Sequence, residues 1–167
     1  MSSNSPKNEF YIRFATREDV PIILEFIYGL AEYEHMIDQV VATEEFLETK
    51  LFDEQKAEVI LGIYQQKPVC FALFFHNFST FLGKSGIYIE DLFVLTPYRR
   101  KGLGKKLLTY LANLALQRDC KRLDWACHDW NEPSIRFYKE LGAIALEDLT
   151  IYRMQDEGLR KLAHNPS

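Results

Sequence analysis

Two kinds of hydrophobic spacing alternate along this chain of 167 residues. Short apolar runs and alternation at every second position predict strands, whereas a spacing of three to four positions predicts helices. The clearest helical stripe covers Leu103–Ala115, where leucines return on one face. An earlier helix is expected to end near Glu32–His35, after a stripe formed by Ile22, Ile23, Phe26, Ile27 and Leu30.

Seven segments have the β-branched, aromatic and aliphatic composition of strands. They are Phe10–Ala15, Ala57–Tyr64, Val69–Phe78, Ile87–Val94, Arg122–His128, Ala143–Leu146 and Thr150–Met154. The turn Gln65–Pro68 predicts a hairpin, and Ser79–Gly86 reads as a longer connection. Hairpins followed by strand–helix–strand–helix order predict a single α/β (α+β) domain over residues 1–167, with a mixed sheet and helices on both faces. The polar segment Met1–Glu9 is expected to be a disordered tail.

Composition narrows the class of protein. The net charge of −4 argues against a nucleic-acid binder. The chain has no apolar run of membrane-spanning length and no apolar leader at its start, so we expect a cytoplasmic protein without a membrane partner. Cys70, Cys120 and Cys127 form no Cys-x-x-Cys pair, so neither a disulfide framework nor a metal site is expected.

A glycine-bearing loop lies between the strand Ile87–Val94 and the helix that starts at Leu103. The first N–H groups of a helix lack internal partners and carry the positive end of its dipole, so they suit a phosphate. Arg99, Arg100 and Lys101 add positive charge beside Gly102 and Gly104. The spacing Arg-x-x-Gly-x-Gly matches neither a Walker loop nor a dinucleotide fingerprint. An ordinary basic turn remains the alternative for the loop alone.

A second segment places polar residues on one face of a short helix. Asn131, Ser134, Tyr138 and Leu141 recur at spacings of three, four and three, so they share a helix face. Asn131 is a favourable N-cap for this helix. A polar face with a tyrosine at a helix start suits a ligand better than a packed core.

Together these motifs resemble the GNAT N-acetyltransferases, and in particular their diamine (spermidine/spermine) and thialysine branch. The resemblance rests on Glu90-Asp91, the Arg-x-x-Gly-x-Gly loop, Trp130-Asn131 with Phe137-Tyr138, and Leu30–Glu34, and it extends from about Ile12 to Met154. It implies a GNAT fold with a twisted, mostly antiparallel sheet of about six to seven strands. It further implies acetyl-CoA as cosubstrate, an amine acceptor and a homodimer.

The resemblance assigns a role to each matching position. Backbone groups of Leu92, Phe93 and Val94 are expected to hold the pantetheine arm as an added strand would. The pyrophosphate is expected at the loop, which consists of Arg99, Arg100, Lys101, Gly102, Leu103, Gly104 and Lys105. Asn131, Ser134 and Tyr138 are expected at the thioester end. The expected acceptor-binding residues are Tyr33, Glu34, Ser79, Glu90 and Glu147.

The chemistry of acetyl transfer to an amine needs a base and an acid. An alkylammonium titrates near pH 10.4, so at neutral pH almost none carries the free electron pair that attacks. We expect Glu90 to accept the proton and Tyr138 to protonate the departing sulfur. Backbone N–H groups around Leu92 are expected to stabilise negative charge on the acetyl oxygen. Because Glu90 and Asp91 are adjacent in an expected strand, their side chains are expected on opposite faces.

The expected acceptor is a small cationic molecule with a primary amine. Polyamine-specific members of the branch carry Asp-Pro-Trp where this chain has Ser79-Thr80-Phe81, so a distant ammonium would lose an acidic partner. The chain therefore resembles relatives that acetylate lysine-like amines such as thialysine. A peptide or protein N-acetyltransferase, and a non-catalytic acetyl-CoA-binding domain on the same fold, remain alternatives.

Overall fold

The computed structural model describes residues 9–164. The expected tail Met1–Glu9 therefore lies, apart from Glu9, outside the described residues. The chain divides into two compact units, Met1–Ala126 and Cys127–Ser167. The single domain expected from the sequence stays a prediction.

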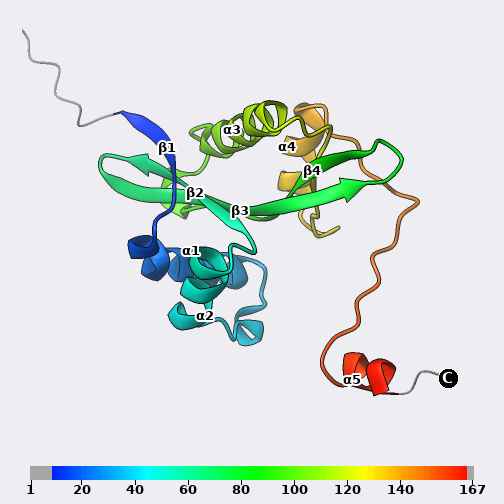
Figure 1. Cartoon of the computed structure of the whole chain (residues 1–167). Coiled ribbons are helices and arrows are strands. Elements are labelled where there is room, and N and C mark those ends of the chain that lie inside the picture. The colour runs from blue at the N-terminus through cyan, green and yellow to red at the C-terminus, as the bar shows by residue number, and fades with distance from the viewer. Residues whose placement is uncertain (1–8, 165–167) are drawn as a thin grey trace, which may run out of the picture. The chain divides into compact units, whose positions relative to one another are not determined.

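The first unit is built on one five-stranded sheet in the order β1-β2-β3-β4-β5 (Figure 1). All neighbours are antiparallel except β4 and β5, which run parallel. The strands are β1 (Phe10–Phe14), β2 (Glu58–Tyr64), β3 (Lys67–Ser79), β4 (Lys84–Val94) and β5 (Leu123–Trp125). The helices are α1 (Val20–Tyr33), α2 (Glu44–Glu48), which continues into a wider π turn at Thr49–Asp53, and α3 (Leu103–Gln117).

Helices cover both faces of this sheet, as the sequence predicts: α1 and α2 lie on one face and α3 on the other (Figure 1). The α1 face is closed by fully buried rings of Phe26 and Phe71, whose centroids are 5.1 Å apart in a stacked arrangement. Phe93 of β4 joins the same cluster. On α3, the predicted leucine stripe is buried, with Leu107 and Leu111 fully so. The mixed sheet with helices on both faces that the sequence predicts is thus confirmed.

The strand count is lower than the six to seven expected. Neither Ala143–Leu146 nor Thr150–Met154 forms a strand, and the strand expected at Arg122–His128 shrinks to Leu123–Trp125. Side chains of both missing strands are exposed, with Ile144 at 85% and Tyr152 at 92%. Apolar alternation alone does not make a strand, because backbone hydrogen bonds need a neighbouring strand.

The connection expected at Ser79–Gly86 is also shorter in the structure. β3 and β4 form one long hairpin in which Ser79 pairs with Lys84, so only residues 80–83 make the turn. Gly86, which suggested a loop, lies within β4 opposite Asn77. A Cβ there would collide with the Asn77 side-chain oxygen, so this glycine allows a close approach and does not end the strand.

The second unit contains α4 (Glu132–Glu140) and α5 (Glu157–His164). The predicted N-cap of α4 is confirmed, because the Asn131 side-chain oxygen accepts a hydrogen bond from the Ser134 backbone N–H at 3.4 Å. Gly142 follows α4 with φ of 88°, the left-handed conformation that commonly ends helices. The sequence did not predict α5. Within residues 9–164, no helix is both long and apolar enough to cross a membrane.

Candidate active site

A β-bulge in β4 determines how its acidic residues are presented. Leu73 of β3 pairs with Asp91, and the next residue, Phe74, pairs with Ile89. Glu90 is therefore the extra residue, and two residues of β4 stand opposite one of β3. The strict alternation that placed Glu90 and Asp91 on opposite faces is lost at this point.

Three carboxylates gather around the bulge. Asp91 is partly buried, and its pKa is raised to about 7 by burial first, and then by the negative charges of Glu90 and Glu34. Glu90 itself is exposed. Glu34 is the C-cap of α1, and its charge acts on Asp91, so this end of the helix lies near the bulge. Sequence reasoning assigned no proton-handling role to Asp91, although its place beside Glu90 was the available signal.

The raised pKa of Asp91 predicts an unusual pH dependence of stability. The unfolded carboxyl titrates near 3.8, so folding favours its protonated form, and the stabilisation is complete below that pH. Stability is then lost as the pH rises through about 7. We expect Asp91→Asn to raise the free energy of unfolding by up to about 4 kcal/mol near pH 8 and to change it little near pH 3. Urea unfolding at both pH values measures this difference, and equal effects at the two would contradict it.

Among residues 9–164, no strand pairs beyond the bulge with the edge of β4 that faces away from β3, which we call its open edge. β5 pairs with β4 only over Ile87–Ile89. The Leu95 N–H donates to the Val69 carbonyl at 3.0 Å, so in the antiparallel register the backbone groups of Val94, and of Leu92 two residues before it, face away from β3. Those of Phe93 face β3, and its side chain lies in the core. Of the three residues expected to hold pantetheine, Leu92 and Val94 thus have the suitable orientation.

The N-terminus of α3 has the features of an anion site. Gly102 is its N-cap, with φ of 74° and open space where a Cβ would lie. The first helical bond runs from the Lys106 N–H to the Gly102 carbonyl at 3.1 Å, so the N–H groups of Leu103, Gly104 and Lys105 precede the helical ladder. No side chain caps this end of the helix. These groups, with the exposed Arg100 and Lys101, fit the phosphates of acetyl-CoA.

Arg99 takes a different direction from the other loop cations. Its Nε donates to the Val94 carbonyl at 2.9 Å, and its guanidinium lies 4.7 Å from the ring centroid of Tyr33. Lys101 Nζ lies 5.3 Å from the ring centroid of Tyr98, a residue of the same loop. The loop cations expected at the pyrophosphate are therefore not equivalent.

The structure does not bring Ser79 to the carboxylates. Ser79 pairs with Lys84, and its hydroxyl oxygen accepts a hydrogen bond from the Leu82 N–H at 3.3 Å within the turn. Glu90 lies six positions after Lys84 in β4, which corresponds to about 20 Å along the strand. By contrast, Tyr33 and Glu34 lie together at the end of α1.

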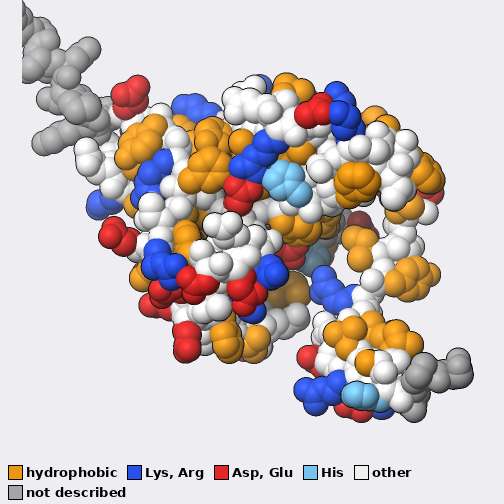
Figure 2. All heavy atoms as spheres, in the orientation of Figure 1, with side chains coloured by type: hydrophobic (Ala, Val, Ile, Leu, Met, Phe, Trp, Pro, Cys, Tyr) orange, Lys and Arg blue, Asp and Glu red, His pale blue; other side chains and the backbone are white. Residues whose placement is uncertain are grey.

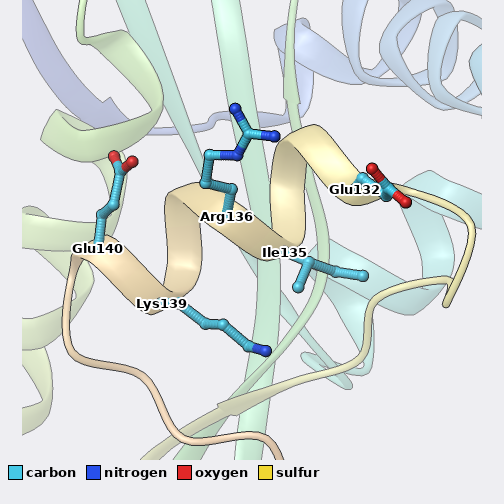
Figure 3. A pocket seen from close by; sticks show the side chains of 5 residues that line it. All are labelled: Glu132, Ile135, Arg136, Lys139 and Glu140. Atoms are coloured by element: carbon cyan, nitrogen blue, oxygen red, sulfur yellow. The ribbon is translucent and has the colours of Figure 1, made fainter.

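The second unit holds the remaining predicted residues. Asn131 is buried at the start of α4, Ser134 and Tyr138 are partly buried on the helix, and the ring centroids of Phe137 and Tyr138 are 5.4 Å apart. Glu147 is exposed between α4 and α5. Figure 3 shows the side chains that line a hollow along one face of α4. The hollow has a volume of about 520 Å³, and none of the predicted site residues lines it. The lining residues are Glu132, Ile135, Arg136, Lys139 and Glu140.

Comparison with known families identifies the fold. The model of the Acetyltransferase (GNAT) family matches residues 24–143, which include the bulge, the glycine loop and α4. This chain belongs to the GNAT acetyltransferase family. The resemblance found in the sequence motifs is confirmed, and the chain is an N-acetyltransferase.

Relatives of this GNAT enzyme include two curated proteins that match along nearly the whole chain. A thialysine N-epsilon-acetyltransferase from Bos taurus is 35% identical over 91% of this chain and 96% of its own length. An L-ornithine N5-acetyltransferase from Arabidopsis thaliana is 31% identical over 90% of this chain and 86% of its own length. Among solved structures, an integron cassette protein from the mobile metagenome of V. cholerae superposes with a TM-score of 0.78 at 28% identity, over 93% of this chain and 98% of that one.

Acetyl-CoA is the cosubstrate of GNAT enzymes, and the first unit of this acetyltransferase has the groups to hold it. The open edge of β4 offers backbone partners to an extended arm, and the N-terminus of α3 offers N–H groups to phosphates. Neither feature depends on a metal, and residues 9–164 show no group of three or more His, Cys, Asp or Glu side chains arranged to hold one.

Proposed function

We propose that this enzyme transfers the acetyl group of acetyl-CoA to the side-chain amine of a small lysine-like acceptor. The observation that carries the proposal is the gathering of Glu34, Glu90 and Asp91 beside the open edge of β4. Three carboxyl groups in one place raise the local concentration of a cation, and a base among them makes its amine reactive.

Two of the relatives favour an amino-acid acceptor over a polyamine. One is named for the Nε position of thialysine and another for the N5 position of L-ornithine, so both names describe acetylation of a side-chain nitrogen. The sequence argument against polyamines relied on Ser79. Its pairing partner Lys84 lies about 20 Å along β4 from Glu90. Support for the lysine-like acceptor therefore comes from these two relatives, whereas the carboxylates support a cationic amine of either kind.

Each step of the reaction has a candidate residue. Bound acetyl-CoA supplies an activated acetyl thioester, held by the backbone of Leu92 and Val94 and by the loop Arg100–Lys105. Glu90 accepts the proton of the acceptor ammonium, directly or through water. The Leu92 N–H stabilises negative charge on the acetyl oxygen, and Tyr138 donates a proton to the departing sulfur. The resemblance to the family assigns Asn131 and Ser134 to the thioester end of acetyl-CoA.

Asp91 extends the proton path from Glu90. A carboxyl group with a pKa of about 7 exchanges protons readily at neutral pH, which is the condition that general base catalysis favours. The negative charge of Glu90 contributes to this raised pKa, so we propose that Asp91 receives the proton that Glu90 takes from the acceptor. Tyr33 and Glu34 form the acceptor side of the site at the end of α1.

Thiol release from acetyl-CoA tests the reaction class. We expect release to depend on an added primary amine and to be fastest with thialysine, L-ornithine or L-lysine. Amine-independent binding of acetyl-CoA without turnover would support the non-catalytic alternative. Turnover confined to peptide substrates would support a peptide or protein N-acetyltransferase.

We also propose that the enzyme acts as a homodimer. The segment between α4 and α5 exposes a series of large apolar side chains, and α5 adds Leu159 and Leu162 to them. Figure 2 shows orange apolar groups at the surface of this part of the chain. Exposed apolar groups in such number favour association, because burying them removes them from water. Sedimentation equilibrium gives the mass in solution, and a value equal to one chain of 19.6 kDa would contradict the dimer.

A further inference from the structure

The Arg99 side chain links the loop before α3 to β4 and to α1. Its Nε donates to the Val94 carbonyl at the end of β4, with a nitrogen–oxygen distance of 2.9 Å. Its guanidinium carbon lies 4.7 Å from the ring centroid of Tyr33, the last residue of α1, and 5.2 Å from that of Phe93. Both distances lie within the range of cation–π contacts. One side chain of the loop before α3 thus contacts both β4 and α1.

The ring of Phe93 is packed closely against α1. It is nearly buried and lies edge-on to Phe26, with centroids 6.5 Å apart. α1 approaches it so closely that a Cβ on Gly29 would lie only 3.0 Å from the Phe93 ring. Because Phe93 has no room to move away, the guanidinium that rests on it has a defined position. The Tyr33 ring therefore rests against a guanidinium whose position is fixed.

The Val94 carbonyl, to which Arg99 donates, belongs to the edge of β4 where the cosubstrate is proposed to bind. In the register of β3 and β4 it faces the open edge, where Leu92 and Val94 are proposed to hold the pantetheine arm. Arg99 already donates to this carbonyl, so the part of the open edge that a ligand can use ends at Val94. The same contact sets the distance between that edge and the end of α1.

We propose that Arg99 is a positioning residue that holds Tyr33 and Glu34 of α1 against the open edge of β4. This inference deepens the proposed function and rests on it, because it assigns the acceptor side of the site to the end of α1. Arg99 then acts on the acceptor through Tyr33, and the phosphates are left to Arg100, Lys101 and the N–H groups of α3. Arg100 is exposed, with φ of 60°.

An arginine is required for this task. Its planar guanidinium presents its face to the aromatic rings while its Nε–H donates in the plane to a carbonyl. A lysine at position 99 keeps the positive charge but lacks both the plane and the Nε–H. The variant Arg99→Lys therefore separates positioning from simple attraction of phosphate, since a phosphate site tolerates a lysine better than a stacked site does.

The test compares acceptor kinetics with cosubstrate binding. We expect Arg99→Ala and Arg99→Lys each to lower kcat/KM for the amine acceptor by about tenfold or more, mainly through KM, while the calorimetric Kd of CoA changes by less than about threefold. Arg100→Ala is the contrasting variant, and we expect it to weaken CoA binding with little effect on the acceptor KM. Tyr33→Leu combined with Arg99→Ala is expected to add little further loss, because both changes remove the same contact.

Two results would overturn the proposal. One is a large rise in the Kd of CoA for Arg99→Ala that Arg99→Lys restores, which would make Arg99 a phosphate ligand. The other is a loss of thermal stability with unchanged acceptor kinetics at temperatures where the variants are folded, which would make its role only structural. If the wild-type enzyme acetylates no amine, the proposed function fails. The CoA titrations then decide separately whether Arg99 binds phosphate.

Discussion

Replacing Glu90 by glutamine is expected to lower kcat/KM for the amine acceptor roughly 100- to 10,000-fold near neutral pH. The substitution keeps the size of the side chain and removes its ability to accept a proton. At neutral pH less than about 0.1% of an alkylamine is unprotonated, so without a base the enzyme depends on that small fraction. The loss is therefore expected to shrink as the pH rises toward 10. Steady-state rates measured across this pH range give the profile.

Tyr138→Phe is the matched comparison, because its proposed task concerns the departing sulfur and not the acceptor amine. We expect a lower rate without the same recovery at alkaline pH. Asp91→Asn provides a second comparison, since a proton passed from Glu90 to Asp91 predicts a shift of the pH profile in that variant. Wild-type rates in both Glu90→Gln and Tyr138→Phe at every pH would contradict the proposed roles and leave positioning as the source of catalysis.

Replacing Gly104 by aspartate is expected to weaken CoA binding by at least about 100-fold. The new carboxylate would stand among the first N–H groups of α3, where the pyrophosphate is proposed to bind. The fold is expected to survive, because Gly104 is not among the glycines with positive φ and an acidic residue is favourable in the first turn of a helix. Isothermal titration with CoA measures the affinity.

Gly104→Ala is the control for this change. It adds a methyl group without charge, and alanine favours a helix over glycine, so stability is expected to increase slightly. We expect its loss of CoA affinity to be much smaller than that of the aspartate variant. Equal affinity in Gly104→Asp and the wild type would place the phosphates elsewhere and remove the loop from the site.

The sequence predicted correctly those elements whose pattern is visible within the segment itself. The leucine stripe of α3, the N-cap Asn131 and the hairpin of β2 and β3 are all present. The missing strands at Ala143–Leu146 and Thr150–Met154 show the limit of such patterns, since a strand needs a partner that the segment does not specify. α5 was missed because its sequence is short and has Gly158 in its first turn.

The site was predictable in its residue types but not in its geometry. The glycine loop and the acidic pair are visible in the sequence, whereas the bulge at Glu90 is not, because it depends on the register of β3 against β4. The bulge changes the expected relation of Glu90 to Asp91. Burial, and then the negative charges of Glu90 and Glu34, raise the pKa of Asp91 to about 7. The contacts of Arg99 with Tyr33 and Phe93 were likewise hidden, since they join residues far apart in sequence.

A competition experiment tests the proposed acceptor most directly. The purified enzyme is given acetyl-CoA and an equimolar mixture of thialysine, L-ornithine, L-lysine, spermidine and spermine, and the products are identified by mass spectrometry before one-tenth of any acceptor is consumed. We expect the acetyl group on the side-chain nitrogen of an amino acid, with its formation slowed at least about 100-fold in Glu90→Gln at neutral pH. Acetylspermine or acetylspermidine as the main product would contradict the account.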